Sequence, residues 1–151
     1  METTTVQRHD PRTKSTAFIG QSDEERKKIA KVGIFEALLV KNDRILEGMT
    51  SNFFHIRDST LYTAQRDILL GVTRRTLIRA ARGRGVEVRY IPLKLDQLPA
   101  VEEAFITSSS RGVVPVVQID DVTVGRGRVG ELTKELSAAY EAYIRRKAER
   151  I

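Results

Sequence analysis

Apolar and polar positions along this chain follow a pattern that predicts short strands interrupted by a few helices. Residues 33–40 form an apolar run broken only by Glu36, and Asn42 with Asp43 is typical of a turn. The segment after this turn, residues 44–56, is again largely apolar. We therefore expect a hairpin or meander in this part of the chain. Further strands are predicted at 61–63, 86–91, 104–108, 113–119 and 122–124.

Helices are expected where apolar residues recur every three or four positions, or where a capping sequence precedes a charged run. The predicted helices are 23–31, 73–82 and 131–150, with a single helical turn at 95–98. Gly83 is a stop signal for the second helix, and a basic cluster ends the third.

Strands and helices alternate unevenly in this prediction. Such an order favours a mixed α+β fold with a barrel-like sheet and flanking helices over a regular series of βαβ units. Residues 1–20 contain Pro11 and many Thr and Ser residues, so we expect an extended lead-in there. Residues 21–151 are predicted to form a single domain.

Composition narrows the possible chemistry. The chain has 151 residues, of which 40% are hydrophobic and 30% charged, as is typical of a folded domain. It contains no long apolar run and no signal-peptide pattern, so we expect a cytoplasmic protein without a membrane partner. There is no cysteine, and His9 and His55 are the only histidines, so no metal site is expected. The remaining chemistry is that of Lys, Ser, Thr, Tyr and carboxylates.

The net charge of +6 favours anionic ligands, because 18 of the 26 basic residues are arginines, which bind carboxylate and phosphate groups. Much of the positive charge lies in residues 74–89, where six arginines accompany the single acid Glu87. This stretch lacks interleaved aromatic residues for base stacking, so a solvated helix face is favoured over a nucleic-acid partner.

Residues 125–130 match the G-x-G-x-x-G pattern of dinucleotide-binding folds. That fold requires a further strand after the helix, with an acidic residue about 20 positions on. The chain ends at Ile151, still within the predicted helix. We therefore interpret this loop as a Gly-rich connection between a strand and a helix.

Several residues have side chains or positions suited to binding an anion or to acid–base chemistry, although each also has an ordinary structural explanation. Thr73 lies at the start of a predicted helix, where unpaired N–H groups can bind phosphate or a Thr can simply cap the helix. Residues 107–112 offer hydroxyl groups between two apolar strands. Glu47 stands in an otherwise uncharged strand, and Lys14 lies in the lead-in.

Taken together, Lys14 and the segments EALL, EGMTSNFF, ILLGVTR, EAFITSSSRGVVPV and GRGRVGELT resemble, in order, the class IV aminotransferase family. These pyridoxal-phosphate enzymes of fold type IV include branched-chain and D-amino-acid aminotransferases and aminodeoxychorismate lyase. The resemblance covers residues 14 to about 145. It implies amino-group transfer between an amino acid and a 2-oxo acid, with pyridoxal 5'-phosphate as cofactor, by a dimer.

The resemblance also implies roles for individual residues. Lys14 matches the Schiff-base lysine, which precedes Glu47 by 33 positions, and Glu47 matches the carboxylate that faces the pyridine nitrogen. The remaining matches are an apolar residue against the cofactor ring, the groups that bind its phosphate, and the loop on the substrate side. They are Leu69 for the ring, Val72, Thr73 and Ser109 for the phosphate, and Ser110 and Arg111 for the substrate side.

The chain departs from the family pattern before Lys14, where the family has a smaller domain and an arginine that clamps the phosphate. Only 13 residues precede Lys14, so we expect weak cofactor binding by this chain alone. Ile19 stands where the branched-chain branch has an aromatic residue. Two alternatives to an aminotransferase stay open. One is a lyase that expels pyruvate, and the other, suggested by the missing smaller domain, is a truncated, inactive domain that acts as a binding or assembly module.

Overall fold

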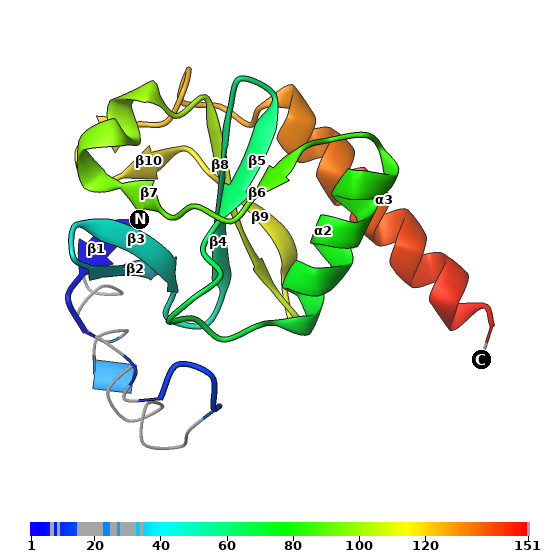
Figure 1. Ribbon diagram of the computed structural model, residues 1–151, viewed down its shortest axis with the longest axis horizontal. Coiled ribbons are helices and arrows are strands. Elements are labelled where there is room, and N and C mark those ends of the chain that lie inside the picture. Colours follow the sequence, from blue (N-terminus) through cyan, green and yellow to red (C-terminus); the bar gives the residue numbers. More distant parts are fainter. Residues whose placement is uncertain are drawn as a thin grey trace.

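The computed structural model describes residues 1–6, 8, 10–14, 23–24, 27, 33 and 35–150. The helix expected at 23–31 lies largely outside these residues. Within the described residues, a nine-stranded sheet curls around a core, with two helices packed on one face (Figure 1). Its strands are β1 (Glu2–Thr4), β2 (Ala37–Lys41), β3 (Arg44–Gly48), β4 (Asn52–Arg57), β5 (Thr60–Thr63), β6 (Val88–Arg89), β7 (Leu93–Lys94), β8 (Glu103–Ser108) and β9 (Gly112–Val116).

Three helices and a small hairpin complete the described fold. They are α2 (Val72–Gly83), the 3-10 helix η1 (Leu95–Ala100), α3 (Glu131–Ala148), and the hairpin of β10 (Gln118–Ile119) with β11 (Val122–Thr123). The predicted mixed α+β fold with a barrel-like sheet and flanking helices is confirmed. No helix in the described part of the chain combines the length and apolar character needed to cross a bilayer.

The predicted meander is present, and its two tight turns explain why it forms. Asn42 and Asp43 have φ values of 50° and 58°, and Asp58 and Ser59 have φ values of 49° and 57°. Two successive residues with positive φ match the twist of antiparallel strands, and Asn and Asp tolerate this conformation better than most residues. The turns therefore set the register of β2 against β3 and of β4 against β5.

Strands β4 and β8 form the centre of the sheet and are buried on both faces. In β4, Phe53 packs into a core on one face and Phe54 into a core on the other. In β8, Ile106 and Phe105 divide in the same way. Because side chains in a strand alternate between faces, a continuously apolar strand needs a cover on both sides. The helices α2 and α3 supply one cover through Leu77, Ile78, Ala81, Leu136 and Tyr140.

The Gly-rich loop before α3 is a structural connection, as the sequence indicated. The Glu103 carboxylate accepts hydrogen bonds from the backbone N–H of Leu132 and of Thr133, at 3.2 and 2.7 Å. It thus occupies donors at the start of α3 that a dinucleotide phosphate would need. An added Cβ at Gly130 would collide with this same carboxylate, so a larger residue there would displace the Glu103 side chain from the start of α3.

One strand was not predicted, and two strand predictions need correction. Residues 2–4 of the lead-in form β1, which pairs in parallel with β2. The strand predicted at 86–91 is limited to β6, and the chain then forms β7, paired with β3. Pro92, which has no N–H to donate, lies between these short strands. The strand predicted at 113–119 is divided into β9 and β10, because its two parts pair with different partners.

Candidate functional site

Three polar residues from three different strands meet side by side in the sheet. Asn52 at the start of β4 pairs with Glu47 of β3 on one side and with Thr107 of β8 on the other. All three are buried, with exposed fractions of 1% for Glu47, 5% for Asn52 and 2% for Thr107. Burying polar side chains is unfavourable unless they are paired, so this group marks a candidate functional site.

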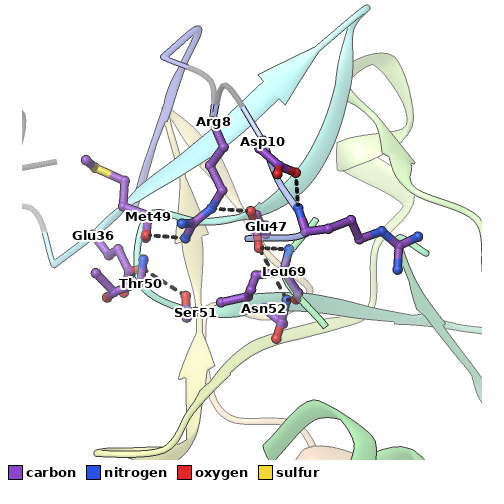
Figure 2. Close-up of polar contacts among 10 residues, drawn as sticks. Arg8, Asp10, Glu36, Glu47, Met49, Thr50, Ser51, Asn52 and Leu69 are labelled. Carbon is purple, nitrogen blue, oxygen red and sulfur yellow. Dashed lines mark hydrogen bonds and ion pairs between the residues drawn. The ribbon is translucent and has the colours of Figure 1, made fainter. Parts of the chain in front are cut away.

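Glu47 is held by three donors (Figure 2). Its Oε1 accepts a hydrogen bond from Arg8 Nε at 2.8 Å, and its Oε2 accepts one from the Leu69 backbone N–H at 3.1 Å and a longer one from Asn52 Nδ2 at 3.4 Å. Burial raises the pKa of Glu47 to about 7, although the Arg8 guanidinium opposes this rise. The carboxyl group is therefore able to change its protonation state near neutral pH.

The segment that carries Lys14 is attached to the sheet through arginine side chains. Arg8 donates to the Met49 carbonyl oxygen at 3.0 Å as well as to Glu47, and Arg12 donates to the Gln65 carbonyl oxygen at 2.9 Å. These contacts hold the chain on both sides of residue 10. Lys14 then lines the same cavity as Glu47, with its side chain exposed.

The helix α2 presents its N-terminus to this cavity. No side chain caps the helix, and its first turn contains no acidic residue. The hydroxyl of Thr73 does not cap its own helix, which was one explanation left open by the sequence. Unpaired N–H groups at the start of a helix carry partial positive charge and bind anions.

Gly71, just before α2, allows the helix to lie close to the sheet. A Cβ at this position would collide with Asn52 Oδ1, which no side chain can accommodate without a shift. Asn52 also donates through Nδ2 to the Leu69 carbonyl oxygen at 2.7 Å. The segment 69–71 is thus fixed against β4 on one side, and this contact positions the N-terminus of α2.

The end of β8 and the loop that follows it supply a wall of hydroxyl groups. Thr107, Ser108, Ser109 and Ser110 all line the cavity. Thr107 Oγ1 is buried and has no hydrogen-bond partner among the described residues. Since buried polar atoms in proteins are nearly always paired, an unpaired hydroxyl in a residue that lines the cavity is a reason to consider a polar ligand there.

The cavity has a volume of about 370 Å³, which is enough for a small cofactor. Its lining residues come from the lead-in, the β3–β4 region, the start of α2 and the β8–β9 loop. They are Arg8, Lys14, Glu47, Met49, Thr50, Ser51, Asn52, Leu69, Gly71, Val72, Thr73, Thr107, Ser108, Ser109 and Ser110.

Arg111 lies outside this lining, because a buried carboxylate holds it. Arg111 donates to Glu36 Oε2 at 2.7 Å and to Thr50 Oγ1 at 3.0 Å. The other oxygen of Glu36 accepts from the Thr50 N–H and the Ser51 hydroxyl, at 2.8 and 2.9 Å. Glu36 therefore ties the β3–β4 region to the β8–β9 loop at the edge of the cavity.

Seven of the eight residues singled out in the sequence meet at this cavity. They are Lys14, Glu47, Leu69, Val72, Thr73, Ser109 and Ser110. Sequence reasoning missed the contacts of Arg8 and Glu36, and it considered Thr107 only as part of the hydroxyl-rich segment 107–112. Glu36 carried a weak signal because it is charged within an apolar segment, whereas Arg8 lies in a polar lead-in and carried none.

Comparison with known proteins identifies the family of this chain. The model of the "Amino-transferase class IV" family matches residues 2–119, and the chain belongs to this family. It is 31% identical over 118 residues to the D-alanine aminotransferase of Bacillus licheniformis, covering 77% of this chain and 42% of that protein. It is 34% identical over 101 residues to the branched-chain-amino-acid aminotransferase of Escherichia coli K12, covering 66% of this chain and 33% of that protein.

Solved structures show the same fold. A branched-chain amino acid aminotransferase from T.th. in complex with N-(5'-phosphopyridoxyl)-L-glutamate matches with a TM-score of 0.86 at 28% identity. The match covers 93% of this chain and 49% of that one. The same enzyme with pyridoxamine 5'-phosphate matches equally well. The present chain thus spans well under half of the curated relatives and about half of these structures.

Proposed function

We propose that this chain is the cofactor-binding part of a pyridoxal-phosphate-dependent aminotransferase, acting between an amino acid and a 2-oxo acid. The observation that carries the proposal is the convergence of three groups on one cavity. They are the Lys14 amine, the buried Glu47 carboxylate and the uncapped N-terminus of α2. Pyridoxal phosphate presents an aldehyde, a basic ring nitrogen and a phosphate, so each group has a chemical counterpart.

The described residues fit this cofactor. Val72 and Thr73, with the helix N-terminus, would hold the phosphate together with Ser109, and the unpaired Thr107 hydroxyl lies in the same wall. Leu69 would pack against the ring. When bound, pyridoxal phosphate supplies an electron sink for the charge that develops at the substrate's α-carbon.

Lys14 and Glu47 would carry the proton chemistry. The Lys14 amine would hold the cofactor covalently and, once released by substrate, move a proton to and from the α-carbon. Glu47 would keep a proton on the ring nitrogen, and the Arg8 contact favours its ionised form. Ser110 and Arg111 would lie on the substrate side, with Arg111 held in place by Glu36.

The first test concerns Lys14. Adding pyridoxal phosphate to the purified chain should give a visible absorbance band that disappears on borohydride reduction, with the label recovered on the peptide containing Lys14. Lys14→Ala should abolish the band, whereas Lys94→Ala, which removes an exposed lysine on β7, should leave it unchanged. A reducible band that persists in Lys14→Ala would show that another lysine carries the cofactor.

The second test separates binding from chemistry at Glu47. Glu47→Gln should still bind the cofactor but slow the half-reaction with an amino acid, because a neutral amide cannot hold the ring nitrogen protonated. Equal half-reaction rates in the variant and the parent would rule out this role. Release of pyruvate without amino transfer would favour the lyase alternative, and binding without turnover would favour an inactive module.

A further inference from the structure

A second cavity lies along α2, and its lining is strongly basic. This cavity has a volume of about 330 Å³. Among its lining residues are Arg74, Arg75, Arg79 and Arg82, with Gln65 and Tyr90, and the full lining contains no Asp or Glu. A cavity lined by one sign of charge concentrates ions of the opposite sign.

Three of the four arginines of this cavity have no acidic partner in the part of the chain that the structure describes. Arg75, Arg79 and Arg82 make no ion pair with any carboxylate among the described residues, and α2 contains no acidic residue. Arg79 and Arg82 donate only to the hydroxyl oxygens of Tyr143 and Tyr90, at 3.1 and 3.0 Å. Like charges three or four residues apart on a helix repel each other, so a bound anion would relieve a cost already present in the fold.

The floor of the cavity is also cationic. Arg74 is only 3% exposed, and its guanidinium donates to two neutral acceptors, the Ala64 carbonyl oxygen and Gln65 Oε1, both at 2.7 Å. Its Nε has no partner among the described residues. The guanidinium carbons of Arg74 and Arg82 lie 5.6 and 5.7 Å from the centre of the Tyr90 ring, which fixes this wall.

The arginines of the cavity that still have unused N–H donors lie in a row along the helix. Arg75, Arg79 and Arg82 follow one face of α2, and at 1.5 Å per residue the first and last are about 10 Å apart along the helix axis. The Tyr90 hydroxyl accepts from Arg82 and keeps its own proton to donate, and the Gln65 amide keeps its N–H₂ group. A single phosphate reaches only part of this row, whereas a chain of phosphates spans it.

We propose that this cavity binds a small molecule carrying two or more linked phosphate groups. The site is separate from the cofactor cavity, and the proposal does not depend on cofactor binding. An elongated polyphosphate is favoured over a nucleic acid because the cavity lining offers a single aromatic ring, Tyr90, and two guanidinium groups already contact that ring.

The test uses sodium tripolyphosphate as the probe and the complete 151-residue chain at low ionic strength. Calorimetric titration should detect binding that weakens as salt is added. In Arg75→Gln/Arg79→Gln the affinity should fall at least about tenfold, because two charge-assisted contacts are lost. The matched control is Arg126→Gln/Arg128→Gln, which removes the same charge from the exposed Gly-rich loop and should bind like the parent.

Four results would overturn the proposal. The first is the absence of tripolyphosphate binding, and the second is an equal loss of affinity in both double variants, which would indicate only a net-charge effect. The third is tripolyphosphate binding that is competed away by pyridoxal phosphate, because the probe would then occupy the cofactor cavity. The fourth is binding of a different ligand that equals or exceeds the binding of tripolyphosphate. That ligand could be citrate, which is a compact anion, or a single-stranded oligonucleotide that tripolyphosphate fails to displace. Circular dichroism of both variants confirms that folding is intact.

Discussion

Two buried groups in the sheet are expected to oppose each other in the pH dependence of stability. Burial raises the pKa of Glu47 from 4.5 to about 7, and burial lowers the pKa of His55 from 6.5 to about 4, helped by the nearby Arg57 charge. Folded Glu47 therefore binds more protons than unfolded Glu47 between these values. Folded His55 binds fewer protons than unfolded His55.

The signs of the two effects follow from linkage. The stabilising contribution of Glu47 is complete below pH 4.5 and is lost as the pH rises to about 7. The contribution of His55 is complete above pH 6.5 and is lost as the pH falls to about 4. Each shift corresponds to roughly 3 kcal/mol in the free energy of unfolding. Between about pH 4.5 and 6.5 the loss of the Glu47 contribution with rising pH therefore offsets the gain of the His55 contribution.

Single variants should remove this cancellation. In Glu47→Gln, the free energy of unfolding should rise by about 1.4 kcal/mol per pH unit relative to the parent over this range. In His55→Phe the free energy of unfolding should fall by about the same amount per pH unit relative to the parent. The new phenylalanine ring can keep the stacking that His55 makes against Phe53 and Tyr62. Urea unfolding at several pH values measures these slopes. Carboxylates that all three proteins share change the stability of each by the same amount, so their effect cancels when a variant is compared with the parent. Parallel curves for the parent and both variants would refute the reasoning.

The remaining predictions concern packing and capping. Gly71→Ala should destabilise the fold by about 1–3 kcal/mol, because the new Cβ meets the Asn52 side chain. Gly83→Ala, where nothing lies within 4 Å, should instead stabilise it by up to about 1 kcal/mol. Equal melting temperatures for these two variants would contradict the close approach. Glu103→Ala should lower the free energy of unfolding by about 1–2 kcal/mol, because the N–H groups at the start of α3 lose their acceptor. A thermal unfolding curve that matches the parent would show that this contact does not cap the helix.

Local sequence patterns predicted the parts of this fold that depend on near neighbours. The meander followed from turn residues that tolerate positive φ, and α2 followed from the spacing of its buried side, with Leu77 and Ala81 among its residues. The predicted family also followed from the order of short motifs and is confirmed by comparison. The meander and α2 depend on residues within a few positions of one another, whereas the family resemblance also depends on the order of motifs between residue 14 and about residue 145.

Partners that are distant in sequence were not predictable from such patterns. Arg8 reaches Glu47 across 39 positions and Arg111 reaches Glu36 across 75, and neither arginine differs in its local sequence from a solvated one. The parallel pairing of β1 with β2 likewise depends on a contact between residues more than thirty positions apart. A pattern of hydrophobic residues specifies which face is buried but not which distant segment covers it.

Two walls of the cavity that contains Lys14 and Glu47 differ in how they are attached to the fold, and this affects how they open. Glu47, Asn52 and Thr107 belong to the backbone ladder of a sheet buried on both faces, so their amide hydrogens should exchange with solvent only when the whole domain unfolds. The segment 10–14 is connected through side chains such as that of Arg12, and its amides should exchange through local opening. The wall that carries Lys14 can therefore move aside to admit a ligand while the wall that carries Glu47 stays in place.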